Sequence, residues 1–236
     1  MSTRRLYSRD LKKGIFNLLK SEDLDQMLKI LCELPARQVT NPLLSFLLNP
    51  NPKIRWASIT ALGAVVANLA TLDLESARVI MRRLMWQLND ESGGIGWGCP
   101  ETMGEVMACH DGLAQEYVHI LVSYVIERGN FLEHEPLRQG AVWGIGRIAQ
   151  VKPDLVKDAT YHLMPFIESP NPALRGLTVW ALGMLGAYEA CSRIEDLLDD
   201  DAEIEIYLDR KLDSHRVKDL AHQALVEIGC GQTPEG

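Results

Sequence analysis

The stretch LRGLTVWALG at residues 174–183 decides the fold, because related ten-residue stretches recur along the chain. IRWASITALG lies at residues 54–63 and LRQGAVWGIG lies at residues 137–146. Each begins with an aliphatic residue and Arg, continues with small or aliphatic residues, and ends in an aliphatic residue followed by Gly. Recurrence of one pattern along a chain is typical of repeat architectures.

Two weaker copies complete the series, IGWGCPETMG at residues 95–104 and VKDLAHQALV at residues 217–226. Successive copies are 41, 42, 37 and 43 residues apart when they are aligned on their last residues, which are Gly63, Gly104, Gly146, Gly183 and Val226. A period near 40 residues predicts stacked helical units.

Each copy carries apolar residues at helical spacing, and each follows a second amphipathic segment. These preceding segments are 41–48, 74–88, 116–128, 154–167 and 190–198. Turn-forming residues separate the first and second helix of each repeat, at 49–52, 93–94, 129–130 and 169–172. Asn41 and Pro42 are expected to begin one first helix. Two further helices are expected at 8–20 and 21–34, with the second starting at Ser21.

The pattern of Asn-Pro, Arg and Ala-Leu-Gly over residues 41–229 resembles the HEAT family, and in particular the short HEAT-like repeats that phycobilin lyases also contain. The resemblance implies an all-α, right-handed α-α superhelix of about six helical pairs. It further implies a single solenoid domain over residues 1–236, with an N-terminal helical cap at 1–40, central repeats at 41–190 and a C-terminal repeat at 191–230.

One segment breaks the helical pattern. Between residues 202 and 213, apolar and charged residues alternate with period two, and Asp209-Arg210 lies between the halves. This alternation predicts a small β-hairpin inserted in the last repeat, with a charged loop as the alternative.

Composition excludes several classes of protein. The 236 residues are 47% apolar with a net charge of -8, which is the balance of a folded chain and not of a disordered one. The apolar stretch 60–72 is shorter than the ~20 residues of a membrane helix, so no membrane span is expected. Five cysteines without paired spacing lead us to expect no disulfide framework and a cytoplasmic location.

Charge is distributed unevenly. Residues 1–60 carry ten Lys/Arg and five Asp/Glu, whereas residues 61–130 carry four and nine. Residues 131–190 are close to balance, and residues 191–236 carry five and twelve. Duplex affinity comes mainly from phosphate neutralisation, so an acidic middle argues against a HEAT-like DNA glycosylase or any other nucleic-acid binder.

The repeat alignment places four tryptophans on one row of the second helices, at positions seven or three residues before the aligned Gly. They are Trp56, Trp97, Trp143 and Trp180. In similar HEAT repeats this row lines the concave groove, and tryptophan is enriched at binding hot spots. Glu101, Glu105 and Arg147 would be the polar members of the groove. The alternative is that the rings pack on one another and on the next helix.

A basic residue recurs eight residues before the aligned Gly, as Arg55, Arg138, Arg175 and Lys218. We expect these side chains to bind carbonyl groups or an acidic residue of the adjacent turn. Binding of an external anion is the alternative.

The third repeat differs most from the others, with several glycines before Cys99 and with Pro100 in its second helix. A helix that starts there would have Cys99 as its N-cap, where the helix dipole lowers a thiol pKa. Trp97, Cys99, Glu101 and Glu105 therefore form the leading candidate for a specific site. The alternative is an irregular turn with an inert cysteine.

These features favour a non-catalytic scaffold that binds a protein or peptide in a Trp-lined groove. The alternative is a lyase- or chaperone-like enzyme that acts on a small or bilin-like ligand with Cys99 and Glu101. No cofactor is expected, and the histidines and cysteines lack the spacing of a metal site.

Overall fold

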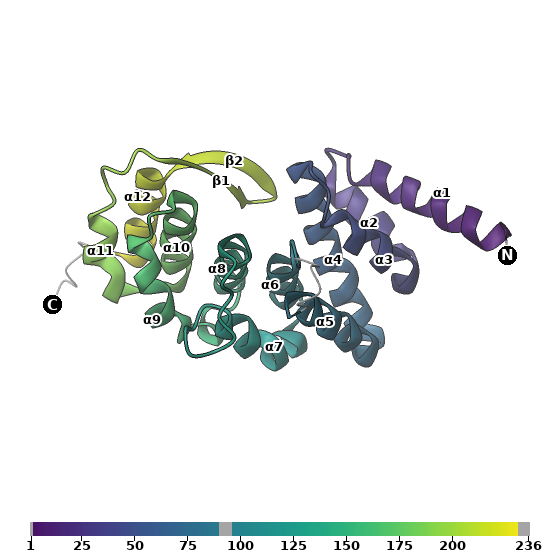
Figure 1. Cartoon of the computed structure of the whole chain (residues 1–236), viewed down its shortest axis with the longest axis horizontal. Coiled ribbons are helices and arrows are strands. Elements are labelled where there is room, and N and C mark those ends of the chain that lie inside the picture. Colours follow the sequence, from purple (N-terminus) through teal and green to yellow (C-terminus); the bar gives the residue numbers. More distant parts are fainter. Residues whose placement is uncertain (1, 90–95, 231–236) are drawn as a thin grey trace. The chain divides into compact units, whose positions relative to one another are not determined.

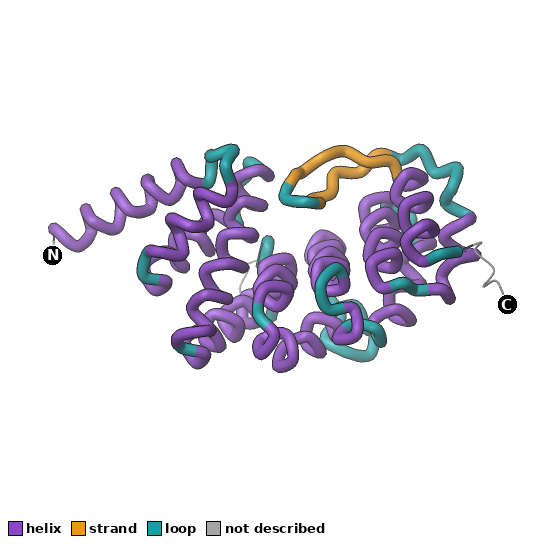
Figure 2. Tube along the Cα trace, turned by 180° about the vertical axis from the view of Figure 1, so that it is seen from behind, coloured by secondary structure: helices purple, strands orange, loops and turns teal. Residues whose placement is uncertain are grey.

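The computed structural model describes residues 2–89 and 96–230 of the chain, which divides into two compact units, Met1–Leu113 and Ala114–Gly236. Within the described residues the fold is mainly α-helical, with one two-stranded sheet near the C-terminus (Figures 1 and 2). The expected fold class, an all-α helical-repeat fold with a small hairpin, is confirmed. The predicted turn at 93–94 and the aligned residue Ile95 lie outside the described residues.

The described residues of unit 1 form six complete helices and the first residues of α7 (Asp111–Ser123), and residues 90–95, which are not described, lie between α5 and α6. The bounds of the six helices are α1 Ser2–Leu18, α2 Leu24–Glu33, α3 Ala36–Phe46, α4 Pro52–Leu72, α5 Leu74–Leu88 and α6 Cys99–Cys109.

Helix α4 is the central helix of unit 1 and packs against α2, α3, α5 and α6. Asn51 caps its start by accepting a hydrogen bond from the Lys53 N–H at 2.9 Å, and Pro52 occupies the first turn. Among the described residues it is the one helix whose length and mean hydropathy, 21 residues and 1.2, would suffice to cross a membrane. However, 67% of its apolar window is buried in the unit, as in the core helix of a folded domain.

The predicted starts of α1, α2 and α3 in unit 1 were wrong. Helix α1 begins at Ser2 and not at residue 8. Helix α3 begins at Ala36 after Pro35, so Pro42 lies inside the helix and not in its first turn. Because proline has no backbone N–H, Pro42 deprives the helix of one internal hydrogen bond. Packing of the helix against its neighbours can compensate for this loss. Helix α2 begins after Asp23, whose carboxylate accepts from the Gln26 N–H at 2.9 Å, and not at Ser21.

Unit 2 begins within α7 and ends with α12. Its elements are α7 Asp111–Ser123, α8 Glu135–Ala149, η1 Pro153–Leu155, α9 Ala159–Leu163, η2 Met164–Glu168, α10 Pro172–Leu185, η3 Tyr188–Ala190, α11 Cys191–Glu195, β1 Glu203–Leu208, β2 Lys211–Arg216 and α12 Val217–Ile228.

The aligned glycines of the repeat motif allow α8, α10 and α12 to pack closely. A Cβ atom on Gly146 of α8 would overlap the Trp180 ring of α10, and one on Gly183 would lie 2.9 Å from the Cα atom of Ala224 in α12. The repeat motif therefore ends in Gly because the next second helix lies against that position.

Apolar positions of the repeat are buried as expected. The first aliphatic residue of each described copy is in the core, and so is the residue before the aligned Gly in the first four copies. In the last copy, Leu225 is half-buried and Val226 is exposed.

The predicted hairpin is present and ends three residues later than expected. Strands β1 and β2 pair antiparallel from Glu203 with Arg216 to Leu208 with Lys211. Asp209 and Arg210 form the turn, both with positive φ. Ile204 and Ile206 are buried, and Ile204 contacts Gly176 of α10, so the inward face of β1 anchors the hairpin on the helices.

The expectation of no disulfide was wrong. Cys191 at the start of α11 and Cys230 after α12 are joined by a disulfide, although they are 39 positions apart in the sequence. Sequence spacing did not reveal this pair because α11 and α12 pack against each other in the folded unit. Cytoplasmic location stays a prediction.

Candidate functional site

The basic residue that recurs in the repeat motif is bound within unit 2, as expected. Arg175 donates two hydrogen bonds to Asp200 Oδ2, at 3.0 and 2.7 Å, and one to the Ser169 carbonyl at 2.7 Å. Arg138 donates to the Leu132 carbonyl at 2.9 Å.

Lys218 forms the corresponding ion pair with Asp201 at 2.5 Å. In each of these three repeats, the basic residue therefore links the second helix, by hydrogen bonds or an ion pair, to the turn or loop that precedes it. A charge-assisted hydrogen bond of this kind is about twice as strong as a neutral one.

Arg55, the corresponding residue of unit 1, is the exception. Its guanidinium makes no hydrogen bond or ion pair with the described residues. The positive charge of Arg55 acts on the Glu101 carboxyl and makes a contribution that lowers the pKa of Glu101. The two groups do not form an ion pair. Arg55 is half-buried at the start of α4.

Helix α6 begins after a glycine in the left-handed backbone conformation. Gly98 is the N-cap with φ 74°, and a Cβ atom there would lie 3.1 Å from Leu47 Cδ2. The Gly98 carbonyl accepts hydrogen bonds from the Thr102 N–H at 3.0 Å and the Thr102 hydroxyl at 2.6 Å. Positive φ and close packing both favour Gly at this position.

The expectation of an activated Cys99 was wrong. Cys99 is the first helical residue and not the N-cap, and it is fully buried. Its thiol donates to Gln87 Oε1 at 3.1 Å. Burial, with a smaller contribution from the charge of Glu101, raises the pKa of this thiol to about 12, opposite to the direction expected from the helix dipole.

Glu101 lies in the first turn of α6 and carries an unsatisfied oxygen. The residue is half-buried, but its Oε2 atom is shielded from solvent and has no hydrogen-bond donor in the part of the chain that the structure describes. Burial raises the pKa of Glu101 to about 7, against the opposing effects of its own backbone N–H and of the Arg55 charge. Near neutral pH this carboxyl therefore exists in both protonation states.

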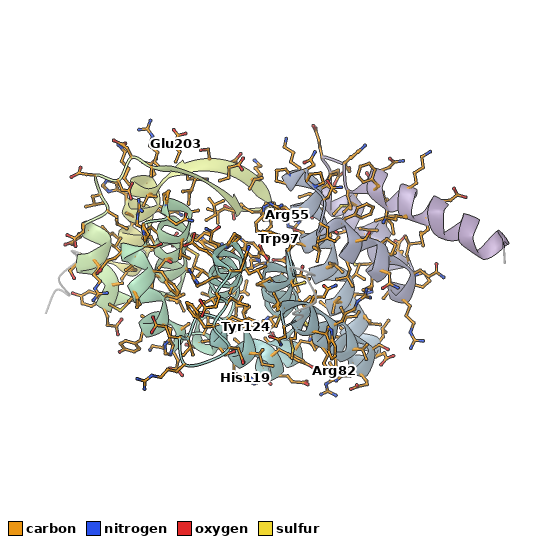
Figure 3. The ribbon with its side chains drawn as sticks, in the orientation of Figure 1. Arg55, Arg82, Trp97, His119, Tyr124 and Glu203 are labelled. Atoms are coloured by element: carbon orange, nitrogen blue, oxygen red, sulfur yellow. A yellow bond between two sulfur atoms is a disulfide. The ribbon has the colours of Figure 1, made fainter. Side chains whose placement is uncertain are left out.

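Trp97 precedes α6 and leaves 36% of its surface exposed. Figure 3 labels Arg55 and Trp97 on the same part of unit 1, the first from α4 and the second from the segment before α6. Trp56, next to Arg55 in sequence, is half-buried. We refer to Arg55, Trp56, Trp97 and Glu101 as the Arg55–Trp97 surface.

Glu105, the other acidic member of the predicted site, is buried one turn further along α6. Its side chain lies against Gly63 of α4, where a Cβ atom would overlap its Cγ atom. Its Oε1 atom is 3.8 Å from the Cys109 thiol. Glu105 therefore contributes to the packing of α4 on α6.

Two of the four predicted groove tryptophans are core residues, which corrects the expectation that they line a surface. Trp143 and Trp180 are 3% and 4% exposed, and their rings stack with centroids 6.4 Å apart. The Trp143 indole N–H donates to the Tyr207 carbonyl of β1 at 2.8 Å. Trp143 thus joins α8, α10 and the hairpin, and the expected alternative of ring packing applies here. Arg147, on α8, is half-buried.

No cluster of three or more His, Cys, Asp or Glu side chains suitable for a metal ion occurs in the described residues. The candidate site is the Arg55–Trp97 surface, which offers an exposed aromatic ring and a cation without a partner in residues 2–89 and 96–230, with the shielded Glu101 carboxyl near that cation.

Sequence reasoning assigned Arg55 a structural role by analogy with the other repeats. A signal was present, since the 39 residues between Glu33 and Asp73 contain no Asp or Glu. Arg55 thus has no acidic neighbour in the adjacent turns, unlike Arg138 with Glu135 and Arg175 with Asp200.

Helices paired in repeats, with close glycine contacts between successive second helices, define a helical-repeat solenoid protein. Residues 135–185 match the model of the HEAT-like repeat family. An uncharacterized protein of Archaeoglobus fulgidus is 28% identical over 149 residues, which cover 61% of this chain and 73% of that protein.

Solved structures of repeat proteins show the same fold. Kap121p bound to Nup53p matches with a TM-score of 0.57 and 12% identity, over 94% of this chain and 25% of the Kap121p chain. A designed armadillo repeat protein in complex with the peptide (KR)4 matches with a TM-score of 0.50 and 16% identity, over 91% of this chain and 98% of that one. At these identities the likeness defines the fold class.

Proposed function

We propose that this chain is a non-catalytic scaffold that binds a peptide segment of a partner protein. The observation that carries the proposal is the Arg55–Trp97 surface, where an exposed indole ring lies in the same part of the unit as Arg55, whose guanidinium has no partner among the described residues. Tryptophan and arginine are the residue types most enriched at binding hot spots. Peptide and protein binding by repeat proteins of the same fold class supports this choice.

The proposed surface is smaller than the groove that the sequence indicated. It contains Trp56, Trp97 and Glu101 from the predicted set, and it adds Arg55. Trp143 and Trp180 stabilise unit 2 and are not part of it. A lyase-like activity at Cys99 is disfavoured, because a buried thiol with a raised pKa is a poor nucleophile.

The test compares two exposed tryptophans of the same unit. Trp86 lies on α5 and is 75% exposed, so it provides a matched control for Trp97. Wild type, Trp97→Ala and Trp86→Ala are each incubated with an array of 12-residue peptides that have blocked termini.

We expect Trp97→Ala to lose about tenfold or more in affinity for the peptides that wild type selects, and Trp86→Ala to keep its affinity. Equal binding by all three proteins, or loss in Trp86→Ala alone, would show that the Arg55–Trp97 surface is not the binding site. Circular dichroism of each variant verifies that the fold is retained.

A further inference from the structure

Arg55 is set apart by comparison with its equivalents in the repeats. In unit 2 the same position holds Arg138, Arg175 or Lys218, and each binds a carboxylate or carbonyl of its own chain. The position is therefore one at which this fold binds an oxygen acceptor. Arg55 occupies it without an acceptor among the described residues.

We infer that the guanidinium of Arg55 binds an Asp or Glu carboxylate of an acidic peptide segment in the partner protein, with the neighbouring side chain of that peptide packed on Trp97. This inference rests on the proposed function and specifies the chemistry of the partner. A guanidinium binds a carboxylate through two parallel hydrogen bonds, which gives geometric specificity as well as affinity.

Charge complementarity favours an acidic partner over a basic one. Residues 1–60, which include Arg55, carry ten basic and five acidic residues. The stretch between Glu33 and Asp73 contains three basic residues, Arg37, Lys53 and Arg55, and no acidic one. No acidic residue of this stretch offsets the charge of Arg55, and an acidic peptide would be attracted to that charge, which raises its association rate and disfavours basic competitors.

The protonation state of Glu101 makes the affinity of Arg55 for the peptide dependent on pH. Glu101 is the carboxyl on which the Arg55 charge acts, so an ionised Glu101 competes with a partner carboxylate for Arg55. A second carboxylate near Glu101 also favours its protonated form. Protonated Glu101 therefore favours the complex, and affinity falls as pH rises through neutrality.

Other charged groups around α6 are engaged elsewhere. On α5, Arg83 binds the Asn41 side chain and acts on the Cys99 thiol. On α6 itself, Cys99 and Glu105 are buried. For Glu101, the charge that matters is that of Arg55 on α4.

The experiment uses pairs of blocked 12-residue peptides that differ only in having Asn and Gln in place of Asp and Glu. Affinities of the full-length chain are measured by fluorescence anisotropy at pH 6 and pH 8. The variants are Arg55→Gln, Arg55→Lys and Glu101→Gln. Arg82→Gln serves as the control, because Arg82 is an exposed arginine of the same unit that already pairs with Glu75.

We expect the acidic peptide to bind wild type about tenfold more tightly than its amide analogue at pH 6, and Arg55→Gln to abolish this difference. Arg55→Lys restores part of it, and Arg82→Gln leaves it unchanged. Wild-type affinity for the acidic peptide falls about three- to tenfold between pH 6 and pH 8, whereas that of Glu101→Gln changes little.

The outcomes separate this inference from the proposed function. Trp97-dependent binding that is equal for acidic and amide peptides, or that Arg55→Gln leaves intact, overturns the inference and leaves the scaffold function standing. Absence of any Trp97-dependent peptide overturns both. Arg55-dependent self-association, measured by sedimentation velocity of the chain alone, would make a second copy the occupant and also overturn the inference.

Discussion

A carboxyl group that is shielded from water and lacks a hydrogen-bond donor favours its protonated form. Glu101 is close to this case, because its Oε2 atom has no donor among the described residues, and burial raises its pKa from an ordinary value of 4.5 to about 7. Because the folded state holds this proton more tightly than the unfolded state, folding is favoured at low pH. The stabilisation is complete below about pH 4.5 and is lost as pH rises through 7.

Glu101→Gln is therefore expected to leave stability nearly unchanged at pH 4.5 and to raise it at pH 8 by about 1–3 kcal/mol, since the amide carries no charge to bury. Urea denaturation at the two pH values measures the difference. Glu22→Gln, at an exposed position, is the control. A Glu101→Gln effect of equal size at both pH values would contradict the assignment of a buried, titrating carboxyl.

Cysteine reactivity provides a second test at this scale. Cys99 is buried with a raised pKa, and Cys109 at the end of the same helix is exposed. Because only the thiolate reacts, iodoacetamide at pH 8 is expected to modify Cys109 quickly and Cys99 only after unfolding. Peptide mass spectrometry over a time course measures both rates. Equal rates in the native protein would reopen the catalytic interpretation of Cys99.

At the scale of elements, the packing of one second helix on the next depends on the aligned glycines. Gly146→Ala places a methyl group against the Trp180 ring, which is itself fixed by its stacking on Trp143. We expect a loss of about 1–3 kcal/mol in the free energy of unfolding. Gly14→Ala on α1 is the control, since a Cβ atom there has nothing within 4 Å. It should be neutral or stabilising by up to about 1 kcal/mol. Similar values for the two variants would contradict close packing at Gly146.

Second helices and the hairpin could be predicted from sequence because each leaves a periodic pattern. The aliphatic-Gly repeat located α4, α8, α10 and α12, and the alternation after residue 202 located the strands. Helix starts were less predictable. Pro42 has the composition of a first turn, yet tertiary contacts extend α3 to Ala36.

Site residues were harder to predict than elements, because members of one predicted row are exposed in one repeat and buried in another. Trp97 and Trp180 both belong to the predicted row, but only Trp97 remains on the surface. The Trp180 ring is covered because Trp143 and Gly146 of α8 fit against it. Periodicity identifies the row that faces the next helix, and it does not indicate which members that helix covers.

At the scale of the whole molecule, the two units differ in charge and in covalent structure. The first 113 residues carry 13 basic and 12 acidic residues, and the other 123 carry 11 and 20. Unit 2 therefore bears the excess negative charge, which opposes compaction. Its sole disulfide among the described residues, Cys191–Cys230, encloses the hairpin and α12.

Reduction of this disulfide is expected to destabilise unit 2 and to spare unit 1. Closure of a 39-residue loop restricts the unfolded chain and corresponds to as much as about 4 kcal/mol. Hydrogen exchange with and without a phosphine reductant measures the effect helix by helix. We expect faster exchange in α11, β1, β2 and α12 after reduction, and unchanged exchange in α2 to α5.

The experiment is made in a Cys32→Ser/Cys109→Ser background, so that these two thiols neither exchange with the Cys191–Cys230 disulfide nor react in the alkylation step, while the remaining free cysteine, Cys99, is buried. Cys230→Ser should reproduce the reduced pattern without any reductant, which separates loss of the bond from other effects of the phosphine. Alkylation after quenching reports the fraction reduced. Unchanged exchange in α11 and α12 in fully reduced protein would mean that helix packing alone holds this end of unit 2, and that the disulfide contributes nothing to its stability.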